Sequence, residues 1–177
     1  MSEALLIIDV QHDFLPPAGA LAVPEGDRVI DAIVALARSG RFDLVVATRD
    51  WHPPDHSSFA GEGGPWPEHC VAESPGAALH ERVEQVAEVV IDKGTERAAE
   101  GYSAFETPAL REVLRERGVD AVTIAGVATD YCVRHTALDA LGEGLRVTVA
   151  TDAVRGIDAE RTAETLRELA EAGAVVD

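Results

Sequence analysis

The sequence contains a single lysine, Lys93, although it carries fifteen basic side chains; the other fourteen are arginines. Arginine is a planar fork with a permanent charge, whereas lysine carries a compact ammonium whose pKa burial can shift, so a site that needs the ammonium cannot use arginine. An arginine-rich chain can also retain one lysine by chance. The position of Lys93 in the fold therefore decides whether it is functional.

Long apolar runs, cysteines and positive charge are also scarce. No apolar stretch approaches the roughly 20 residues of a membrane span, and Cys70 and Cys132 are too few for a disulfide scaffold. The first three residues lack the basic region of a secretory signal. A net charge of −17 repels nucleic acid and anionic membranes. We therefore expect a cytoplasmic protein that binds neither nucleic acid nor membranes. A monomer and a homo-oligomer are both compatible with this composition.

Short apolar runs alternate with helical patterns along the 177 residues. The runs are rich in Val, Ile and Leu without alternation, as in strands that are covered on both faces, and they span 4–8, 44–47, 89–91, 121–125, 147–150 and 174–176. The helical patterns span 29–37, 107–118, 129–141 and 158–172, with Thr107 and Asp158 as expected caps. This order predicts a single α/β domain over 1–177: a three-layer, doubly wound, mainly parallel sheet of about six strands with helices on both faces.

Sites in such sheets lie beyond the carboxyl ends of the strands. The first predicted strand ends at Asp9, the second at Asp50 and the third at Lys93. The fourth leads into a helix whose first turn holds Cys132. Because these ends meet at one edge of the sheet, we expect the side chains to gather there, which favours a functional Lys93.

Asp9, Lys93 and Cys132 form the first candidate constellation. A cysteine attacks as the thiolate, which an adjacent cation and the positive end of a helix stabilise, while a carboxylate can take its proton. These three residues therefore indicate a cysteine hydrolase. The alternatives are a small buried hydrophobic role for Cys132 and a cap or turn role for Asp9.

Asp50, His52, His56 and His69 form the second constellation. Asp50 and His52 point to the same side of an extended strand end, and a histidine can return from the long irregular loop over 51–75 to complete a site of nitrogen and oxygen ligands. One zinc, iron(II) or manganese ion would suit such ligands. Histidines beside prolines in a loop can also be simple polar surface. Cys70, next to His69, is expected to pack rather than to ligate.

Four aromatic residues near the same edge form the third group. Phe14 follows the first strand, Trp66 stands between two prolines of the long loop, and Tyr102 and Phe105 follow Lys93. Two or three of them can wall an apolar slot for a flat ring.

Four segments that carry these residues closely resemble the nicotinamidases, also called pyrazinamidases, of the isochorismatase-like cysteine hydrolase superfamily. They run in family order across nearly the whole chain: DVQHDF at 9–14, RDWHP at 49–53 continuing to WPEHC at 66–70, KG at 93–94 with YSAF at 102–105, and GVATDYCV at 126–133. The chain departs from the usual family pattern at His12, where asparagine is common, and at Glu100, where aspartate is common.

The resemblance implies a role for each matching residue. It implies that Asp9, Lys93 and Cys132 are the catalytic triad. It also implies that Asp50, His52 and His69 hold one divalent metal ion, with His56 matching a histidine that only some members use as a ligand. The residues that it implies at the substrate are Phe14 and Trp66 on the two faces of a pyridine ring, Tyr102 near it, and the backbone N–H groups of Ala128 and Cys132 as an oxyanion hole after a cis Val127–Ala128 peptide.

The activity implied is hydrolysis of the small molecule nicotinamide to nicotinate and ammonia in NAD salvage, through a thioester on Cys132. Three alternatives stand beside it. One is a metal-free amidohydrolase acting on carbamoyl or ureido compounds, and another is a non-catalytic interaction protein on the same fold. The third, isochorismatase itself, is disfavoured because those enzymes lack the cysteine.

Overall fold

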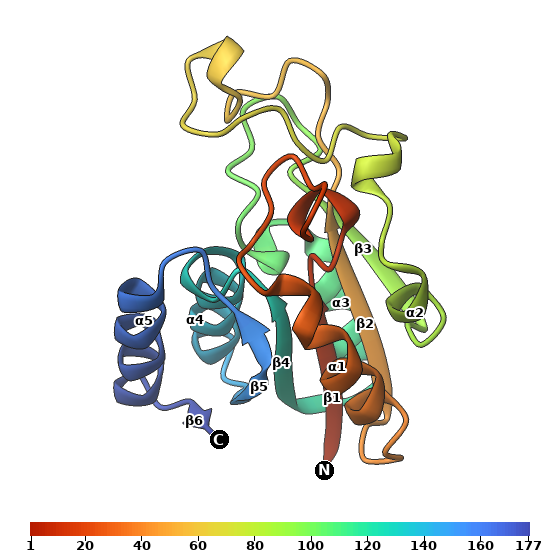
Figure 1. Cartoon of the computed structure of the whole chain (residues 1–177). Helices are drawn as coiled ribbons and strands as arrows, with labels where there is room; N and C mark the ends of the chain where they lie inside the picture. Colours follow the sequence, from red (N-terminus) through yellow and green to blue (C-terminus); the bar gives the residue numbers. More distant parts are fainter.

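The computed structural model describes residues 1–177 and contains one six-stranded, wholly parallel sheet between two layers of helices (Figure 1). The strands follow the spatial order β3-β2-β1-β4-β5-β6. Their bounds are β1 Ser2–Ile8, β2 Leu44–Asp50, β3 Val89–Lys93, β4 Val119–Val127, β5 Arg146–Arg155 and β6 Val175–Val176. The predicted fold class is therefore confirmed.

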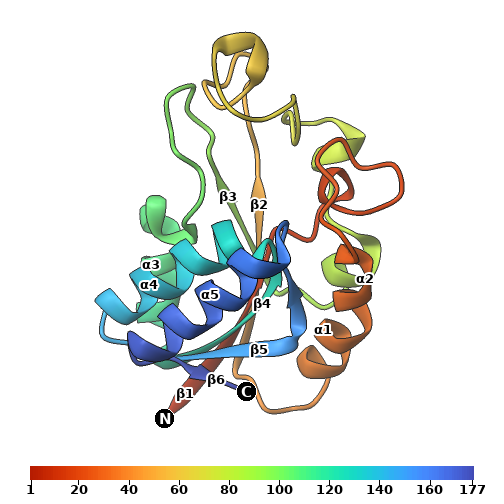
Figure 2. The same cartoon turned by 60° about the vertical axis from the view of Figure 1, so that its left-hand side comes forward.

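Helices cover both faces of the sheet, as Figure 2 shows. On one side lie α1 (Val29–Ala37) and α2 (Glu81–Glu84), and on the other lie α3 (Pro108–Glu116), α4 (Arg134–Gly142) and α5 (Ala159–Glu171). No helix has the length and apolarity needed to span a membrane.

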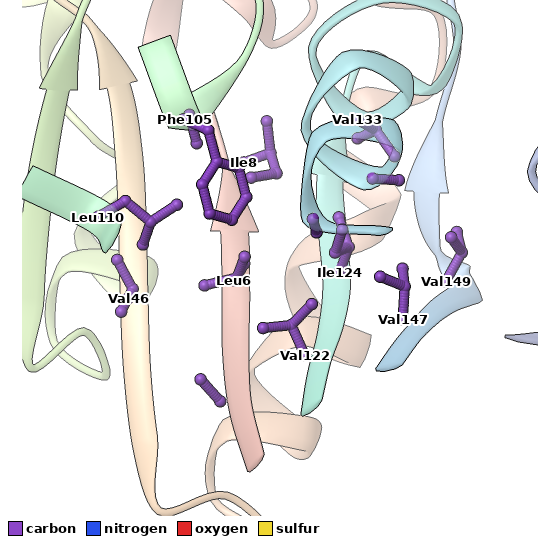
Figure 3. Packing of buried hydrophobic residues seen from close by; sticks show 14 of the residues in the cluster. Leu6, Ile8, Val46, Phe105, Leu110, Val122, Ile124, Val133, Val147 and Val149 are labelled. Atoms are coloured by element: carbon purple, nitrogen blue, oxygen red, sulfur yellow. The ribbon is translucent and has the colours of Figure 1, made fainter. Parts of the chain in front are cut away.

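Two apolar cores fill the spaces between the layers. Successive residues of β1 alternate between them, because side chains of a strand point to opposite faces. Leu6 and Ile8 pack with Leu110 of α3 (Figure 3), whereas Leu5 and Ile7 belong to the core beneath α1. Burial on both faces explains why the strands appear as continuous apolar runs in the sequence.

Two helix starts differ in how they are capped. The Asp158 side chain accepts a hydrogen bond of 2.8 Å from the Arg161 backbone N–H, as expected of the cap of α5. Thr107 occupies the N-cap position of α3, as expected, but its side chain makes no capping hydrogen bond and its hydroxyl is buried without a partner. Pro108 follows at the first helical position, where its fixed φ suits the start of α3.

Strand register gathers the predicted residues at one edge of the sheet. Asp50 pairs with Lys93 across β2 and β3, and Ile8, the residue before Asp9, pairs with Thr48 and Gly126. Gly126 has a φ of +113°, and a Cβ there would lie 2.1 Å from the Ile8 carbonyl oxygen. Only glycine therefore allows β4 to approach β1 this closely beside Asp9.

Candidate active site

Lys93 is completely buried at the centre of the edge. Its Nζ lies 2.8 Å from Oδ2 of Asp9, 2.6 Å from Oδ1 of Asp50 and 3.5 Å from Sγ of Cys132. The ammonium also donates a hydrogen bond to the Gly101 carbonyl. The lone lysine therefore joins two carboxylates and a thiol, and the structure brings Asp9, Lys93 and Cys132 together.

Burial and charge shift the pKa values of these three groups. Burial disfavours the charged ammonium, but the carboxylates of Asp50 and Asp9 outweigh it and hold the pKa of Lys93 well above its ordinary value. Burial raises the pKa of the Asp9 carboxyl, which Lys93 only partly offsets. Burial also raises the pKa of the Cys132 thiol well above its usual range despite the nearby ammonium. The thiol therefore needs a base, and Asp9 is the adjacent carboxylate with raised basicity.

The two carboxylate oxygens of Asp9 have different partners. Its φ of +50° is unusual for a residue other than glycine, and it turns the side chain at the end of β1. Oδ1 accepts a hydrogen bond of 2.7 Å from the Thr48 hydroxyl, whereas Oδ2 forms the ion pair with Nζ of Lys93 at 2.8 Å. Carboxylate oxygens of Asp9 and Asp50 and the sulfur of Cys132 lie within 4.8 Å of one another. A proton can thus pass between Asp9 and Cys132.

Two histidines beside this group have their tautomers fixed by backbone carbonyls. Nδ1 of His52 donates to the Gly94 carbonyl at 2.7 Å, and Nδ1 of His69 donates to the Pro67 carbonyl at 2.8 Å. Because a carbonyl can only accept, each neutral ring keeps the lone pair on Nε2. Both Nε2 atoms face Oδ2 of Asp50, at 3.4 Å from His52 and 4.0 Å from His69.

Asp50, His52 and His69 fit a divalent metal ion. Their ligand atoms converge within 4.8 Å, and all three side chains are buried. Burial raises the pKa of Asp50, but Lys93 and His52 outweigh it and hold the pKa well below its ordinary value, so this carboxylate stays ionised. Burial lowers the pKa of His69, which favours its neutral form. Burial lowers the pKa of His52, but the neighbouring Asp50 carboxylate favours the protonated ring and raises the pKa above its ordinary value.

His56 lies beside this cluster but outside the converging set. Its ring stacks on that of His52 with centroids 4.0 Å apart, and its Nδ1 pairs with the Ser58 hydroxyl at 2.7 Å. Its Nε2 is buried without a hydrogen-bond partner. The structure therefore groups the predicted ligands Asp50, His52 and His69 and leaves His56 behind them. Cys70 packs in the core under α1.

A cavity opens above Cys132, walled largely by aromatic side chains. Trp66 donates from Nε1 to the Tyr102 hydroxyl at 3.0 Å, and its ring meets that of Tyr131 edge-on at 5.1 Å. The four residues predicted at the substrate all line this cavity together with Cys132: Phe14, Trp66, Tyr102 and Ala128. Phe105 is instead packed in the core beneath α3 and α4.

Cys132 lies in a wide helical turn at the carboxyl end of β4. The Val127–Ala128 peptide is cis, as the family resemblance implies. The helix predicted over 129–141 is divided into a π-helix at Thr129–Val133 and the regular helix α4. The backbone N–H groups of Tyr131 and Val133 both donate to the Ala128 carbonyl, each at 3.1 Å. This turn holds Cys132 below the cavity.

Three polar residues that support the site were missed from the sequence. Gln11 donates to the Asp50 carbonyl and accepts from the Asp50 N–H, each at 2.8 Å. Asp130 accepts from the backbone N–H groups of Ile157 and Asp158, at 3.0 and 3.2 Å. Glu106 accepts from two glycines beside Lys93. The sequence signal for Gln11 and Asp130 was a polar residue shortly after the end of a predicted strand. No sequence pattern marked Glu106.

Comparisons with known proteins point to one family. The model of the isochorismatase domain matches residues 3–177. Among relatives, the nicotinamidase of Escherichia coli is 39% identical over 199 residues, covering 98% of this chain and 93% of the relative. The nicotinamidase/pyrazinamidase of Mycobacterium tuberculosis is 43% identical over 177 residues, covering 94% and 93%.

Solved structures agree with these relatives. The pyrazinamidase of Pyrococcus horikoshii in complex with zinc superposes with a TM-score of 0.90 at 47% identity, covering 100% of this chain and 99% of that one. PnC1 from L. infantum in complex with nicotinate has a TM-score of 0.95 at 40% identity, covering 99% and 92%.

Proposed function

Because this chain belongs to the isochorismatase domain family, we propose that it hydrolyses nicotinamide to nicotinate and ammonia, with Cys132 as nucleophile. The observation that carries the proposal is the buried contact of Lys93 with Asp9, Asp50 and Cys132 at the floor of an aromatic cavity. Nicotinamidase relatives and a nicotinate-bound structural neighbour support the choice of substrate.

In the first half-reaction Asp9 takes the proton of the Cys132 thiol, and the thiolate forms a bond to the carboxamide carbon. The backbone N–H groups of Ala128 and Cys132 stabilise the resulting oxyanion. Asp9 then gives its proton to the leaving nitrogen, the C–N bond breaks, and ammonia departs from a thioester. Lys93 remains charged throughout and stabilises the anionic forms of both partners.

In the second half-reaction a water molecule attacks the thioester. Asp9, ionised again, removes a proton from this water and passes it to the Cys132 sulfur as the C–S bond breaks, and the released acid loses its remaining proton to give nicotinate. Phe14 and Trp66 hold the pyridine ring in the cavity and limit its rotation, which keeps the carbonyl carbon over the sulfur.

Asp50, His52 and His69 would hold a divalent ion, and the donor set suits zinc, iron(II) or manganese. Held there, such an ion would supply Lewis-acid chemistry that helps to orient the substrate beside Cys132. A zinc-bound structural neighbour supports this assignment. Because Nδ1 of His52 and of His69 donates to a backbone carbonyl, the Nε2 lone pair of each ring is available to bind an ion.

The test is ammonia release from nicotinamide by the purified zinc-loaded protein. Cys132→Ala should lose all measurable turnover while keeping the wild-type circular dichroism spectrum. Cys70→Ala is the matched control, because Cys70 is the other buried cysteine and lies in the apolar core. A protein that releases no ammonia from nicotinamide, or a Cys132→Ala variant with the wild-type rate, refutes the proposal.

A further inference from the structure

Glu106 carries a pair of hydrogen bonds for which the reaction described above has no use. Its Oε2 accepts from the Gly94 N–H at 3.0 Å, and its Oε1 accepts from the Gly101 N–H at 2.9 Å. Both glycines have positive φ, +62° and +79°, and a Cβ on either would lie 3.3 Å from the Cα of the other. The single carboxylate of Glu106 thus bridges the two glycines that flank the largely exposed segment 95–100.

The same two glycines face the active site with their carbonyls. The Gly94 carbonyl accepts from Nδ1 of His52 at 2.7 Å, and the Gly101 carbonyl accepts from Nζ of Lys93. Each glycine therefore donates outward to Glu106 and accepts inward from a side chain of the site. The carboxylate fixes two glycines that would otherwise be the least constrained residues of this edge.

The backbone before Glu106 is fixed by packing and by a hydrogen bond to α4. Glu106 ends a short 3-10 helix, Ala104–Glu106, in which Phe105 is buried in the core. The Ala104 N–H donates to the buried Thr136 hydroxyl of α4 at 3.0 Å. Because Glu106 is exposed while Ala104 and Phe105 before it are buried, replacing the Glu106 side chain leaves the core intact.

We infer that Glu106 is a positioning residue that holds Lys93 and His52 in register through Gly101 and Gly94, and so couples the catalytic triad to the metal-ligand set. This inference rests on the proposed function for the roles of Lys93 and His52. The reason is geometric: the two side chains have no common partner on the strands except Asp50, and the glycine pair supplies a second link whose spacing the Glu106 carboxylate sets.

The test compares Glu106→Gln with Glu96→Gln. Glutamine keeps the size of glutamate, but its amide presents N–H donors to one of the two glycine N–H groups, so that one bond is lost. Glu96 lies exposed on the segment 95–100, so Glu96→Gln makes the same chemical change without removing a hydrogen bond to Gly94 or Gly101. Zinc affinity is measured by chelator competition, ligand geometry by the visible spectrum of the cobalt-loaded protein, and turnover by ammonia release.

Glu106→Gln should weaken zinc binding and lower kcat, each by about tenfold or more, as is typical when partners that orient metal ligands are removed. Its cobalt spectrum should change, whereas Glu96→Gln should match the wild type in all three measurements. A variant that loses only thermal stability, or only one of the two properties, overturns the coupling role. If Glu106→Gln does not fold, Glu106→Asp, which reaches only one glycine, carries the same comparison.

The zinc and cobalt measurements need no substrate, so they separate this inference from the proposed activity. A wild-type protein that fails to hydrolyse nicotinamide refutes the activity alone. Unchanged zinc affinity and cobalt spectrum in Glu106→Gln refute the positioning role alone.

Discussion

Gly94→Ala should displace His52 without unfolding the protein. A Cβ on Gly94 would lie 2.4 Å from Cε1 and 2.7 Å from Nδ1 of His52, whereas ordinary contact begins at 3.4 Å. The ring must therefore move by 3.4 − 2.4 = 1.0 Å. It cannot move freely, because it is buried, stacked on His56 at 4.0 Å and packed against Phe59.

The expected loss follows from this displacement. A misplacement of about 1 Å costs roughly 100-fold in activity, and we expect a loss of similar size in zinc affinity because His52 presents Nε2 to the ion. The left-handed backbone adds about 1–2 kcal/mol of destabilisation for any L-residue with a side chain. Zinc affinity, kcat/KM and the free energy of unfolding in urea are the three quantities to measure.

Gly118→Ala is the matched control for the backbone contribution. Gly118 has a φ of +63°, nearly that of Gly94 at +62°, but an added Cβ would meet nothing within 4 Å. It should therefore lose the same stability and keep the wild-type zinc affinity and rate. If Gly94→Ala and Gly118→Ala behave alike in zinc binding and turnover, the close approach of Gly94 to His52 does not control the site.

Two further substitutions test the lysine and the core. Lys93→Arg keeps the charge but forces a larger planar group into a fully buried space. It should therefore cost about 1–3 kcal/mol of stability and lower kcat/KM by at least about 100-fold. A near wild-type rate would mean that the site does not require a lysine at position 93. Leu110→Ala removes a completely buried side chain of α3 that does not line the cavity, and it should cost about 2–5 kcal/mol in urea unfolding with an unchanged kcat below its melting temperature. A fall in kcat would mean that this core controls the site.

Much of this architecture could be predicted because parallel strands impose strong patterns. Both faces of the inner strands β1, β2 and β4 are buried, so these strands appear as apolar runs, and the residues after those runs must meet at one edge. Asp9, Asp50, Lys93 and Cys132 could be brought together by this reasoning before any distance was known.

The remainder depended on conformations that local sequence does not encode. Glu106 directly follows the YSAF segment, but its role arises only because Gly94 and Gly101 fold against each other beside it. The stacking of His56 behind His52 depends on the path of the long loop, where spacing cannot tell a ligand from its neighbour. Thr107 is the N-cap residue of α3, but whether its hydroxyl makes the capping hydrogen bond depends on local geometry, and here it makes none.

The central claim is that Cys132 attacks the amide and carries the acyl group. Its most direct test is rapid acid quenching of zinc-loaded protein during turnover of nicotinamide, followed by mass spectrometry of the peptide that contains Cys132. We expect a nicotinoyl group on Cys132 that appears before steady state and disappears when substrate is exhausted. Full turnover with an unmodified Cys132 at every quench time, together with activity retained in Cys132→Ala, would contradict the account.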